Sequence, residues 1–368
     1  MEKKLVAVAM SGGVDSSVAA ALLLEKGCRV VGLTMDLDPS SRGRRVGKAF
    51  QDRCGSGAVE DARSAAAALG IPHHVCSLGR EFEDRVVRYF CVEYAKGRTP
   101  NPCVRCNERV KFSLLADKAR RLGAVALATG HHARLQRDPD SGRFLLRRGR
   151  DPEKDQSYFL YALSQRQLAF ARFPVGNLTK AGVRALARRL GLPAAERPES
   201  QEICFVPDGD YPRFLKSRLP RAERPGLILD PAGRVIGRHR GIVHFTVGQR
   251  RGLGVAFPRP LYVVGLDSKK NTVTAGPNEA LYGRAFMVAR VNWVSVSGLD
   301  GPAQLAVKIR SRHEGARAGV EAVGRLRCRV TFSVPQRAIT PGQSAVFYDR
   351  DLVVGGGIIE GPVRDVRS

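Results

Sequence analysis

Apolar runs of strand length alternate with helical segments along the first third of the chain. The expected strands are Leu5–Ala9, Arg29–Thr34, Pro72–Cys76 and Ala124–Thr129. Between them, apolar residues recur at helical spacing over 16–26 and 60–69, and a glycine follows each stretch. This alternation predicts an α/β fold with a Rossmann-like parallel sheet flanked by helices. In such sheets, ligands bind beyond the carboxyl ends of the strands.

Further helical segments and one expected loop precede a change of pattern along the chain. Helical spacing returns over Glu108–Leu122 and Leu178–Leu190, whereas the basic stretch 36–58 predicts a mobile loop. Beyond about residue 208, β-rich runs separated by turn residues predominate. The clearest are Leu261–Leu266, Thr272–Ala275, Phe286–Val294, Ala303–Ile309, Arg325–Phe332 and Ser344–Tyr348. We therefore predict three domains: α/β over 1–207, a small β-rich domain over 208–278 and a C-terminal β-barrel over 279–368.

The charge of the chain narrows the range of partners. Its 368 residues include 61 basic and 35 acidic ones, which gives a formal net charge of +26 at pH 7. A field of that sign attracts polyanions, above all nucleic acid or acidic membrane surfaces, although a general bias toward arginine contributes to it. Basic clusters on the expected β-rich domains, at 238–240, 249–251 and 308–312, favour RNA.

Hydropathy and cysteine content indicate the compartment. No apolar stretch reaches the roughly 18–20 residues that a bilayer-spanning helix needs. The first strand begins at Leu5, which leaves no room for a signal peptide, so we expect a cytoplasmic protein. In a reducing compartment, the eight cysteines are expected to be buried, catalytic or metal-binding rather than disulfide-bonded.

A Ser-Gly-Gly turn at 11–13 joins the first strand to the first helix. Its two glycines permit backbone conformations that a Cβ would block, and nearby serines offer hydroxyl donors. The helix start adds N–H groups and a positive dipole end, so the turn is expected to bind an anion, and phosphate is the expected one. No Gly-Lys-Ser/Thr follows, so it is not a Walker A loop. A tight turn that binds nothing is the alternative.

Cys103 and Cys106 form a Cys-x-x-Cys pair in a loop pinned by two prolines. We expect the second cysteine near a helix start, where the helix dipole, Arg105 and Arg109 would lower the pKa of its thiol. Such a pair indicates a redox site, half of a metal site or chance. The sequence has no second pair for a four-cysteine zinc site, and the chain does not match the small thioredoxin fold.

The remaining cysteines give weaker signals. Cys204, flanked by isoleucine and phenylalanine, is by itself typical of an ordinary buried cysteine. The role of Cys54, in the expected mobile loop, is open. Packing roles are expected for cysteines in apolar or strand-like surroundings, namely Cys28, Cys76, Cys91 and Cys328.

Seven stretches together closely resemble the bacterial tRNA-specific 2-thiouridylases of the ATP-pyrophosphatase superfamily. In chain order they are SGGVDSS (11–17), GRTPNPxxxCN (97–107), GHHA (130–133), KDQSYFL (154–160), ESQEICF (199–205), FTVGQRRGLG (245–254) and TPGQSAVFY (340–348). The first is shared with many adenylating enzymes, whereas the cysteine-bearing stretches and FTVGQRRGLG are specific. The resemblance implies an N-terminal ATP-pyrophosphatase domain, a small central tRNA-binding domain and a C-terminal β-barrel.

The resemblance also implies roles for individual residues. Cys106 matches the nucleophile of the family and Cys204 its persulfide carrier, with a Cys106–Cys204 disulfide left after sulfur transfer. The positions that match ATP contacts are Ala9, Met10, Ser11, Gly12, Gly13, Val14, Asp15, Ser16, Met35 and Gly130. Those that match the segment lining the target base are Asn101, Pro102 and Cys103. Those that match tRNA contacts are His131, Lys154, Asp155, Gln156, Arg310, Ser311 and Gln343.

The implied reaction is a sulfur transfer to RNA. ATP with Mg²⁺ adenylates C2 of the wobble uridine, and sulfur then replaces the oxygen, giving 2-thiouridine, AMP and pyrophosphate. The implied acceptors are the tRNAs for Lys, Glu and Gln, and the sulfur would come from a sulfur-relay protein or a cysteine desulfurase. The protein is expected to act as a monomer. Asp15 could position Mg²⁺ or water, or be only a helix-start carboxylate.

One position departs from the family pattern. Cys103 stands where many members have aspartate, so the chain has three thiols in its matching stretches, with Cys106 and Cys204. Three cysteines could hold a [4Fe–4S] cluster with one open iron, which is an alternative to the persulfide route.

Two rival functions stay open on the sequence. A small-molecule synthetase of the same superfamily would need neither the +26 charge nor paired cysteines. A non-catalytic RNA-binding protein would need neither the intact turn nor the expected cysteines. Pyrophosphate release that depends on tRNA would exclude both.

Overall fold

The computed structural model describes residues 3–38, 55–196, 203–206, 209–219 and 222–362. The chain forms two compact units, each built from separate stretches of sequence. The first comprises Met1–Val87, Pro102–Gly209 and Asp351–Val353, and the second Arg88–Asn101, Asp210–Arg350 and Val354–Ser368. Within the described ranges, no helix is both long and apolar enough to cross a membrane.

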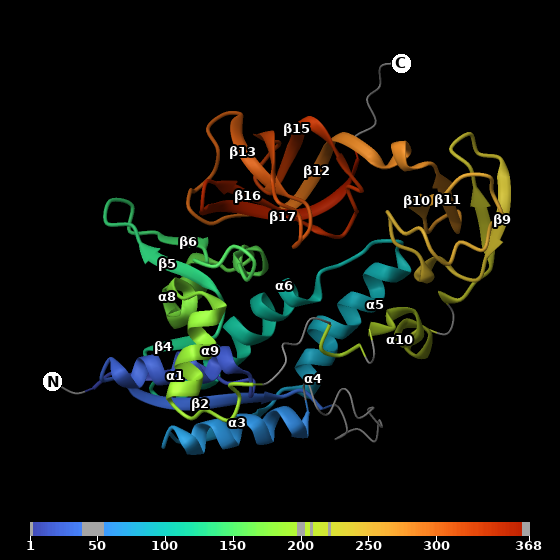
Figure 1. The fold of residues 1–368 in the computed structure, drawn as a ribbon. Helices are drawn as coiled ribbons and strands as arrows, with labels where there is room; N and C mark the ends of the chain where they lie inside the picture. Colours follow the sequence, from blue (N-terminus) through green and yellow to red (C-terminus); the bar gives the residue numbers. More distant parts are fainter. Residues whose placement is uncertain (1–2, 39–54, 197–202, 207–208, 220–221, 363–368) are drawn as a thin grey trace. The chain divides into compact units, whose positions relative to one another are not determined.

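A parallel sheet forms the centre of the first unit and confirms the predicted α/β class (Figure 1). Its order is β3-β2-β1-β4-β7, so the chain moves outward from β1 and then returns to place β4 on the other side. The switch point therefore lies between β1 and β4, where Ala9 pairs with Thr129. The strands are β1 (Leu5–Ala9), β2 (Arg29–Asp36), β3 (His73–Ser77), β4 (Ala126–Thr129) and β7 (Ala171–Arg172).

Alanine-rich helices pack against this sheet. Ala20 of α1 and Ala62 of α3 are fully buried in one apolar cluster with Val8 of β1, because small side chains let the helices approach the strands closely. The helical elements of the unit are α1 (Val14–Glu25), α3 (Ser56–Ala68), α4 (Gly79–Phe82), η2 (Glu83–Val87), α6 (Pro102–Cys106), η3 (Asn107–Leu115), α7 (Ala116–Arg121), η4 (Ser157–Phe159), α8 (Gln165–Phe170), η5 (Pro174–Asn177) and α9 (Lys180–Arg189).

A hairpin of β5 (Ala133–Arg137) and β6 (Phe144–Arg148) also belongs to the first unit. Asp351 accepts hydrogen bonds from Arg134 Nη2 and Arg147 Nη1, each at 2.7 Å. The short stretch around Asp351 therefore joins the first unit through these two ion pairs.

The second unit begins with a helix that lies, in sequence, between two stretches of the first unit. Phe90 of this helix, α5 (Arg88–Ala95), packs against Phe214 of α10 (Tyr211–Arg218) with ring centroids 6.3 Å apart. The small central sheet follows, in the order β10-β11-β8-β9. Its elements are β8 (Gly226–Leu229), β9 (Val235–His239), η8 (Ile242–His244), β10 (Tyr262–Asp267), β11 (Thr272–Gly276) and η9 (Asn278–Leu281).

A closed β-barrel forms the C-terminal part of the second unit, as predicted. The order is β12-β15-β14-β13-β16-β17, and pairing of β17 with β12 closes it. Phe286 and Phe332 meet in its core with ring centroids 5.6 Å apart. The strands are β12 (Tyr282–Trp293), β13 (Ala303–Lys308), β14 (Ala316–Ala322), β15 (Arg327–Arg337), β16 (Ser344–Asp349) and β17 (Leu352–Pro362).

The structure differs from the sequence prediction in several elements. The loop predicted over 36–58 is shorter than expected, because Asp36 ends β2 and residues 56–58 begin α3. Residues 39–54 of that expected loop, with Cys54, lie outside the described residues. The sequence analysis did not predict β17, because its three consecutive glycines have low strand propensity. Gly355 and Gly357 are required there, since a Cβ would lie 2.7 Å from the carbonyl oxygen of Asn292 and 2.6 Å from that of Ala289, respectively, both on β12.

Candidate functional site

A cavity of about 480 Å³ opens beyond the carboxyl ends of β1, β2 and β4, within the first unit. This volume is typical of small-molecule sites, and its position is the one predicted from the sheet topology. Of the residues expected to contact ATP, those in its wall are Ala9, Met10, Ser11, Asp15, Ser16, Met35 and Gly130. Gly12, Gly13 and Val14 lie on the same turn but outside this lining set.

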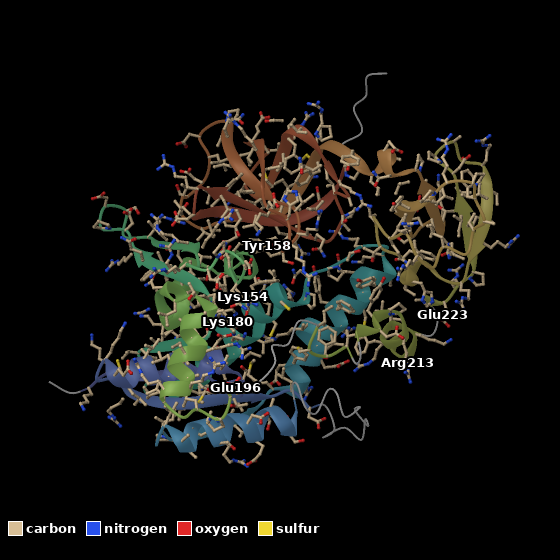
Figure 2. All side chains as sticks on the ribbon, in the orientation of Figure 1. Lys154, Tyr158, Lys180, Glu196, Arg213 and Glu223 are labelled. Atoms are coloured by element: carbon tan, nitrogen blue, oxygen red, sulfur yellow. The ribbon has the colours of Figure 1, made fainter. Side chains whose placement is uncertain are left out.

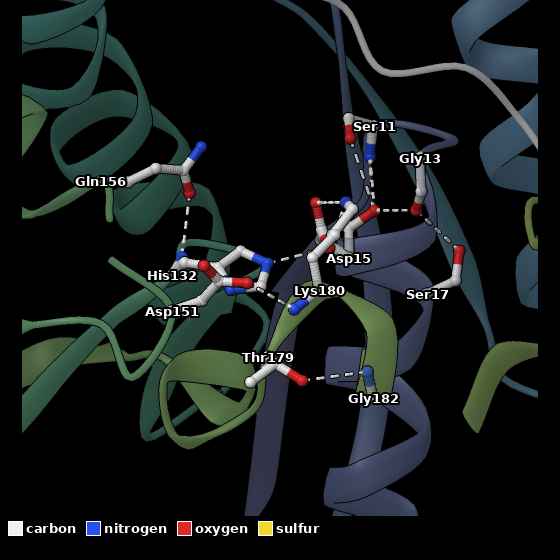
Figure 3. Close-up of polar contacts among 11 residues, drawn as sticks. Ser11, Gly13, Asp15, Ser17, His132, Asp151, Gln156, Thr179, Lys180 and Gly182 are labelled. Atoms are coloured by element: carbon white, nitrogen blue, oxygen red, sulfur yellow. Dashed lines mark hydrogen bonds and ion pairs between the residues drawn. The ribbon is translucent and has the colours of Figure 1, made fainter. Parts of the chain in front are cut away.

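The Ser-Gly-Gly turn is held by its own serines (Figure 3). The hydroxyl groups of Ser16 and Ser17 donate to the carbonyl oxygen of Gly13 at 3.0 and 3.1 Å, and the Ser11 N–H donates to Ser16 Oγ at 3.3 Å. Gly13 caps α1 and has no side chain that could accept from the N–H groups of the first turn. The turn is therefore rigid and presents donors that suit an anion.

The Asp15 carboxylate links three parts of the first unit (Figure 3). It accepts from Lys180 Nζ at 2.8 and 2.7 Å and is 3.1 Å from His132 Nε2. Burial alone would raise the pKa of Asp15, but the hydrogen bonds from His132 and Lys180 outweigh it and hold that pKa below its usual value. Asp15 therefore fastens the first turn of α1 to α9 and to the loop after β4.

Gly130 lets the loop after β4 lie directly on the start of α1. A Cβ at this position would lie 2.6 Å from the carbonyl carbon of Asp15 and from the backbone nitrogen of Ser16. His132 N–H donates to Gln156 Oε1 at 2.9 Å, and the N–H of Gln156 donates back to the His132 carbonyl oxygen at 2.9 Å. These contacts bring Gln156 into the cavity wall.

Of the residues matched to tRNA contacts, four lie in the first unit. His131 and Gln156 line the cavity. Burial lowers the pKa of His131 well below its usual value, so this imidazole is neutral at neutral pH. The carboxylate of Asp155 accepts from the N–H groups of Gly149 and Ser157 and thus shapes a turn. Lys154 and the fully buried Tyr158 lie on this same segment before α8 (Figure 2).

The other matched residues lie in the second unit. Gln343 Nε2 donates to the carbonyl oxygen of Thr99 at 3.0 Å, and the Thr99 N–H donates to the carbonyl oxygen of Pro341 at 2.8 Å. The segment that leads to Asn101 is therefore bonded to the loop before β16. Of the remaining two positions, Arg310 is exposed and Ser311 is half-buried.

A continuous helical segment beginning at Pro102 forms the cysteine-bearing wall of the cavity. Its middle part, η3, is a π-helix, in which i→i+5 hydrogen bonds widen the turn. Gln167 on α8 supports it, since its side-chain amide donates to the carbonyl oxygens of Glu108 and Phe112 at 2.8 and 3.1 Å. One face of η3 lines the cavity through Asn107, Lys111 and Leu115.

Three cysteines from distant parts of the sequence line the same cavity: Cys103, Cys106 and Cys204. Cys204, typical by itself of a buried packing residue, is only half-buried and faces this space. By contrast, Cys76, Cys91 and Cys328 are buried, as expected for packing residues, and Cys28 packs at the edge of an apolar cluster.

The predicted lowering of the Cys106 pKa is wrong. Burial raises the pKa of the Cys106 thiol to about 12, with Lys111 opposing this rise and the neighbouring thiols adding to it. Cys106 lies inside a continuous helix rather than at its start. Moreover, Glu108 pairs with Arg105 at 3.3 Å and with Arg109 at 2.8 Å, which offsets both guanidinium charges. The pKa of Cys103 is raised as well, although this cysteine is more exposed than Cys106.

The described side chains do not fit a resident metal. Among them, no group of three or more His, Cys, Asp or Glu is placed to hold a metal ion, so the three thiols do not fit the [4Fe–4S] cluster considered above. Asp15, considered as a Mg²⁺ ligand, is engaged by Lys180 and His132. We therefore derive no step through a protein-held metal.

Several residues of the site were not predicted from the sequence. Lys180, directly after the Thr179 N-cap of α9, binds Asp15. Thr34 Oγ1 donates to the Met10 carbonyl oxygen at 2.9 Å. The missed cation in the wall is Lys111, four positions after Asn107 in a stretch of expected helical spacing, which was the available signal.

A parallel sheet with a cavity of nucleotide size at its switch point defines the first unit as a Rossmann-like α/β domain. The family model described as "tRNA methyl transferase HUP domain" matches residues 4–208. Those described as "tRNA methyl transferase PRC-barrel domain" and "Aminomethyltransferase beta-barrel domain" match residues 212–277 and 283–359.

Several curated relatives match the chain over nearly its whole length. A tRNA-specific 2-thiouridylase MnmA 1 from Caldanaerobacter subterraneus is 48% identical, with 98% of each chain covered. A tRNA-specific 2-thiouridylase MnmA from Geobacter metallireducens is 50% identical with 97% of each covered. One from Acetivibrio thermocellus is 47% identical over 98% of this chain and 100% of its own length. The chain belongs to the family of tRNA-specific 2-thiouridylases.

Solved structures match more weakly. A 4-thiouridine synthetase–RNA complex with bound ATP is 17% identical and covers 59% of this chain and 50% of its own, with a TM-score of 0.36.

Proposed function

We propose that this protein is a tRNA-uridine 2-sulfurtransferase that activates C2 of the wobble uridine with ATP and replaces its oxygen with sulfur. One observation carries the proposal: Cys106 and Cys204 line the same cavity as Ser11 and Ser16. An anion-binding turn beside two thiols suits activation by ATP followed by sulfur transfer. For this reason we favour thiolation over the methyl transfer named in the domain descriptions.

The first half-reaction makes a leaving group. The C2 carbonyl oxygen of uridine attacks the α-phosphorus of ATP, which releases pyrophosphate and leaves the base adenylated at O2. The turn around Ser11 and Ser16 and the start of α1 would hold the phosphates, and Mg²⁺ enters with the nucleotide. Gly130 and Met35 complete the proposed nucleotide contacts.

The second half-reaction delivers the sulfur. Cys204 first carries a sulfane sulfur as a persulfide. The Cys106 thiolate attacks the inner sulfur of Cys204, forms a Cys106–Cys204 disulfide and releases hydrosulfide. That sulfur attacks C2 and displaces AMP, which yields 2-thiouridine, and a thiol reductant then supplies two electrons to open the disulfide.

The proposed partners follow from this chemistry. The substrate is tRNA, with the acceptors for Lys, Glu and Gln implied by the family, and the base-lining role falls to residues 101–103. A persulfide-carrying relay protein or cysteine desulfurase would load Cys204. The proposed location is the cytoplasm, and the proposed active form is a monomer.

The test is turnover with the full chain under anaerobic conditions. Wild-type protein is incubated with ATP, Mg²⁺, a persulfide source, a reductant and unmodified tRNA, and the digested tRNA is analysed for 2-thiouridine by mass spectrometry. We expect Cys106→Ser and Cys204→Ser to lose at least about 10²-fold in rate, because each removes a sulfur that bonds in the reaction.

Cys103→Ser is the matched control, since it removes a thiol of the same cavity that takes no part in the disulfide. We expect it to keep most of the activity. The proposal is overturned if wild type makes no 2-thiouridine, or if Cys106→Ser and Cys204→Ser are as active as wild type.

A further inference from the structure

The raised pKa of Cys106 poses a chemical problem for the proposed sulfur transfer. A raised pKa favours the protonated thiol at neutral pH, whereas the attacking species is the thiolate. A nearby positive charge lowers the free energy of the thiolate. Among the described residues that line the cavity, Lys111 is the only lysine or arginine.

The fold holds the Lys111 backbone firmly at this wall. The carbonyl oxygens of Glu108 and Phe112, on either side of Lys111, accept from the same Gln167 amide. Nearer to Cys106, Asn107 Nδ2 donates to the carbonyl oxygen of Phe159 at 3.1 Å. Cys106 ends α6 and Lys111 lies on η3, and both residues line this cavity. Thiol and ammonium group are thereby presented to one cavity.

We infer that Lys111 is a positioning residue for the reaction, with an ammonium group that stabilises the Cys106 thiolate as it forms. The inference rests on the proposed function, because it assigns Lys111 to the proposed nucleophile. Its charge opposes the rise in pKa at Cys103 as well as at Cys106, which places it within electrostatic reach of both. The same charge helps to keep His131 neutral.

The other described charges around Cys106 are already engaged. On α6 and η3, Arg105 and Arg109 pair with Glu108. On η2, Arg85 Nη1 donates to the carbonyl oxygen of Arg109. On α1, Asp15 is held by Lys180 and His132. Lys111 is thus the cation of the cavity wall that can stabilise a thiolate at Cys106. The neighbouring thiols of Cys103 and Cys204 disfavour a negative charge there.

The experiment measures alkylation of each cysteine in the reduced, full-length protein. Iodoacetamide is added between pH 7 and 10, and peptide mapping by mass spectrometry gives the rate at Cys106. In Lys111→Met and Lys111→Gln we expect this rate at pH 8 to fall about 3- to 10-fold, with its pH profile moved upward, since one pKa unit is a tenfold change in thiolate. Lys111→Arg, which keeps the charge, should retain most of the rate.

Lys118→Met is the matched control, because Lys118 is exposed on α7 and is not among the residues that line the cavity. It should leave alkylation of Cys106 unchanged. The inference is overturned if both neutral variants, folded by circular dichroism, alkylate Cys106 like wild type, or if Lys111→Arg is as slow as they are. Neither tRNA nor ATP enters this assay, so its outcome is separate from failure of the proposed function.

Discussion

At the scale of single residues, Gly130 shows how the absence of a side chain shapes the proposed nucleotide site. Its Cα faces the backbone of Asp15 and Ser16 so closely that any Cβ must displace the start of α1. That start supplies the proposed phosphate donors. The close approach therefore couples the loop after β4 to the geometry of the turn.

We expect Gly130→Ala to weaken ATP binding by at least about tenfold and to destabilise the fold by about 1–3 kcal/mol through overpacking. Equilibrium binding of a non-hydrolysable ATP analogue, measured by calorimetry, checks the affinity. Gly298→Ala is the matched control, because a Cβ there meets nothing within 4 Å. Unchanged nucleotide affinity in Gly130→Ala would contradict the role given to this contact.

At the scale of elements, the Asp15–Lys180 ion pair connects α1 to α9. The side chains of Lys180 and Asp15 are only 10% and 28% exposed, so solvent screens the pair weakly. A chain that loses one partner keeps a poorly solvated charge beside the nucleotide site. The pair thus fixes the orientation of the first turn of α1.

We expect Lys180→Met to lower the free energy of unfolding by about 2–4 kcal/mol and to weaken ATP binding. The double variant Asp15→Asn/Lys180→Met should recover part of the stability, because no unpaired charge remains. Denaturant unfolding monitored by circular dichroism measures both. Arg188→Met on the same helix breaks the exposed Arg188–Glu196 pair and should leave the midpoint unchanged.

The same pair gives the first unit a defined acid sensitivity. Because the pKa of Asp15 is below its usual value in the folded state, its stabilisation is present above about pH 4 and is lost as the pH falls further. A Lys180→Met variant that lost stability equally at pH 7 and pH 3 would contradict this account.

At the scale of the whole molecule, buried titratable groups set a pH window for stability. Burial lowers the pKa of His73, His131, His239 and His313, so the unfolded chain binds more protons and stability falls as pH drops below about 6.5. Burial raises the pKa of Cys328 to about 12, so the unfolded chain loses its proton first and stability falls as pH rises above about 9. Stability should therefore be greatest between these limits.

Cys328, fully buried in the barrel, provides a direct test of the alkaline limit. Because of this thiol, we expect the free energy of unfolding to be about 1.4 kcal/mol lower at pH 10 than at pH 7. At pH 10 the unfolded thiol is one pH unit above its pKa, and one unit corresponds to that energy. Cys328→Val removes the thiol and should make the alkaline decline shallower. Denaturant unfolding followed by the fluorescence of Trp293, which packs against Phe347 in the barrel, measures the difference. Equal slopes would contradict the prediction.

The sequence by itself determined the elements whose cues are local. Apolar runs and glycine stops predicted β1 at its observed bounds, and the Ser-Gly-Gly turn predicted an anion site at the end of that strand. The hairpin β5–β6 and strand β17 were not predicted. Arginines of the hairpin pair with the distant Asp351, and glycines of β17 allow the close approach of β12. Local propensity carries no information about such distant partners.

Tertiary structure alone decided the chemistry of the cavity. It brought Cys204 to the wall that holds Cys103 and Cys106, and it raised the pKa of Cys106, where neighbouring residues had suggested a lowered one. It also placed Lys111 of η3 on this wall and Lys180 beside Asp15, with which it forms an ion pair. Desolvation and long-range charge pairing depend on which surfaces meet in three dimensions, so no reading of the neighbouring sequence could supply them.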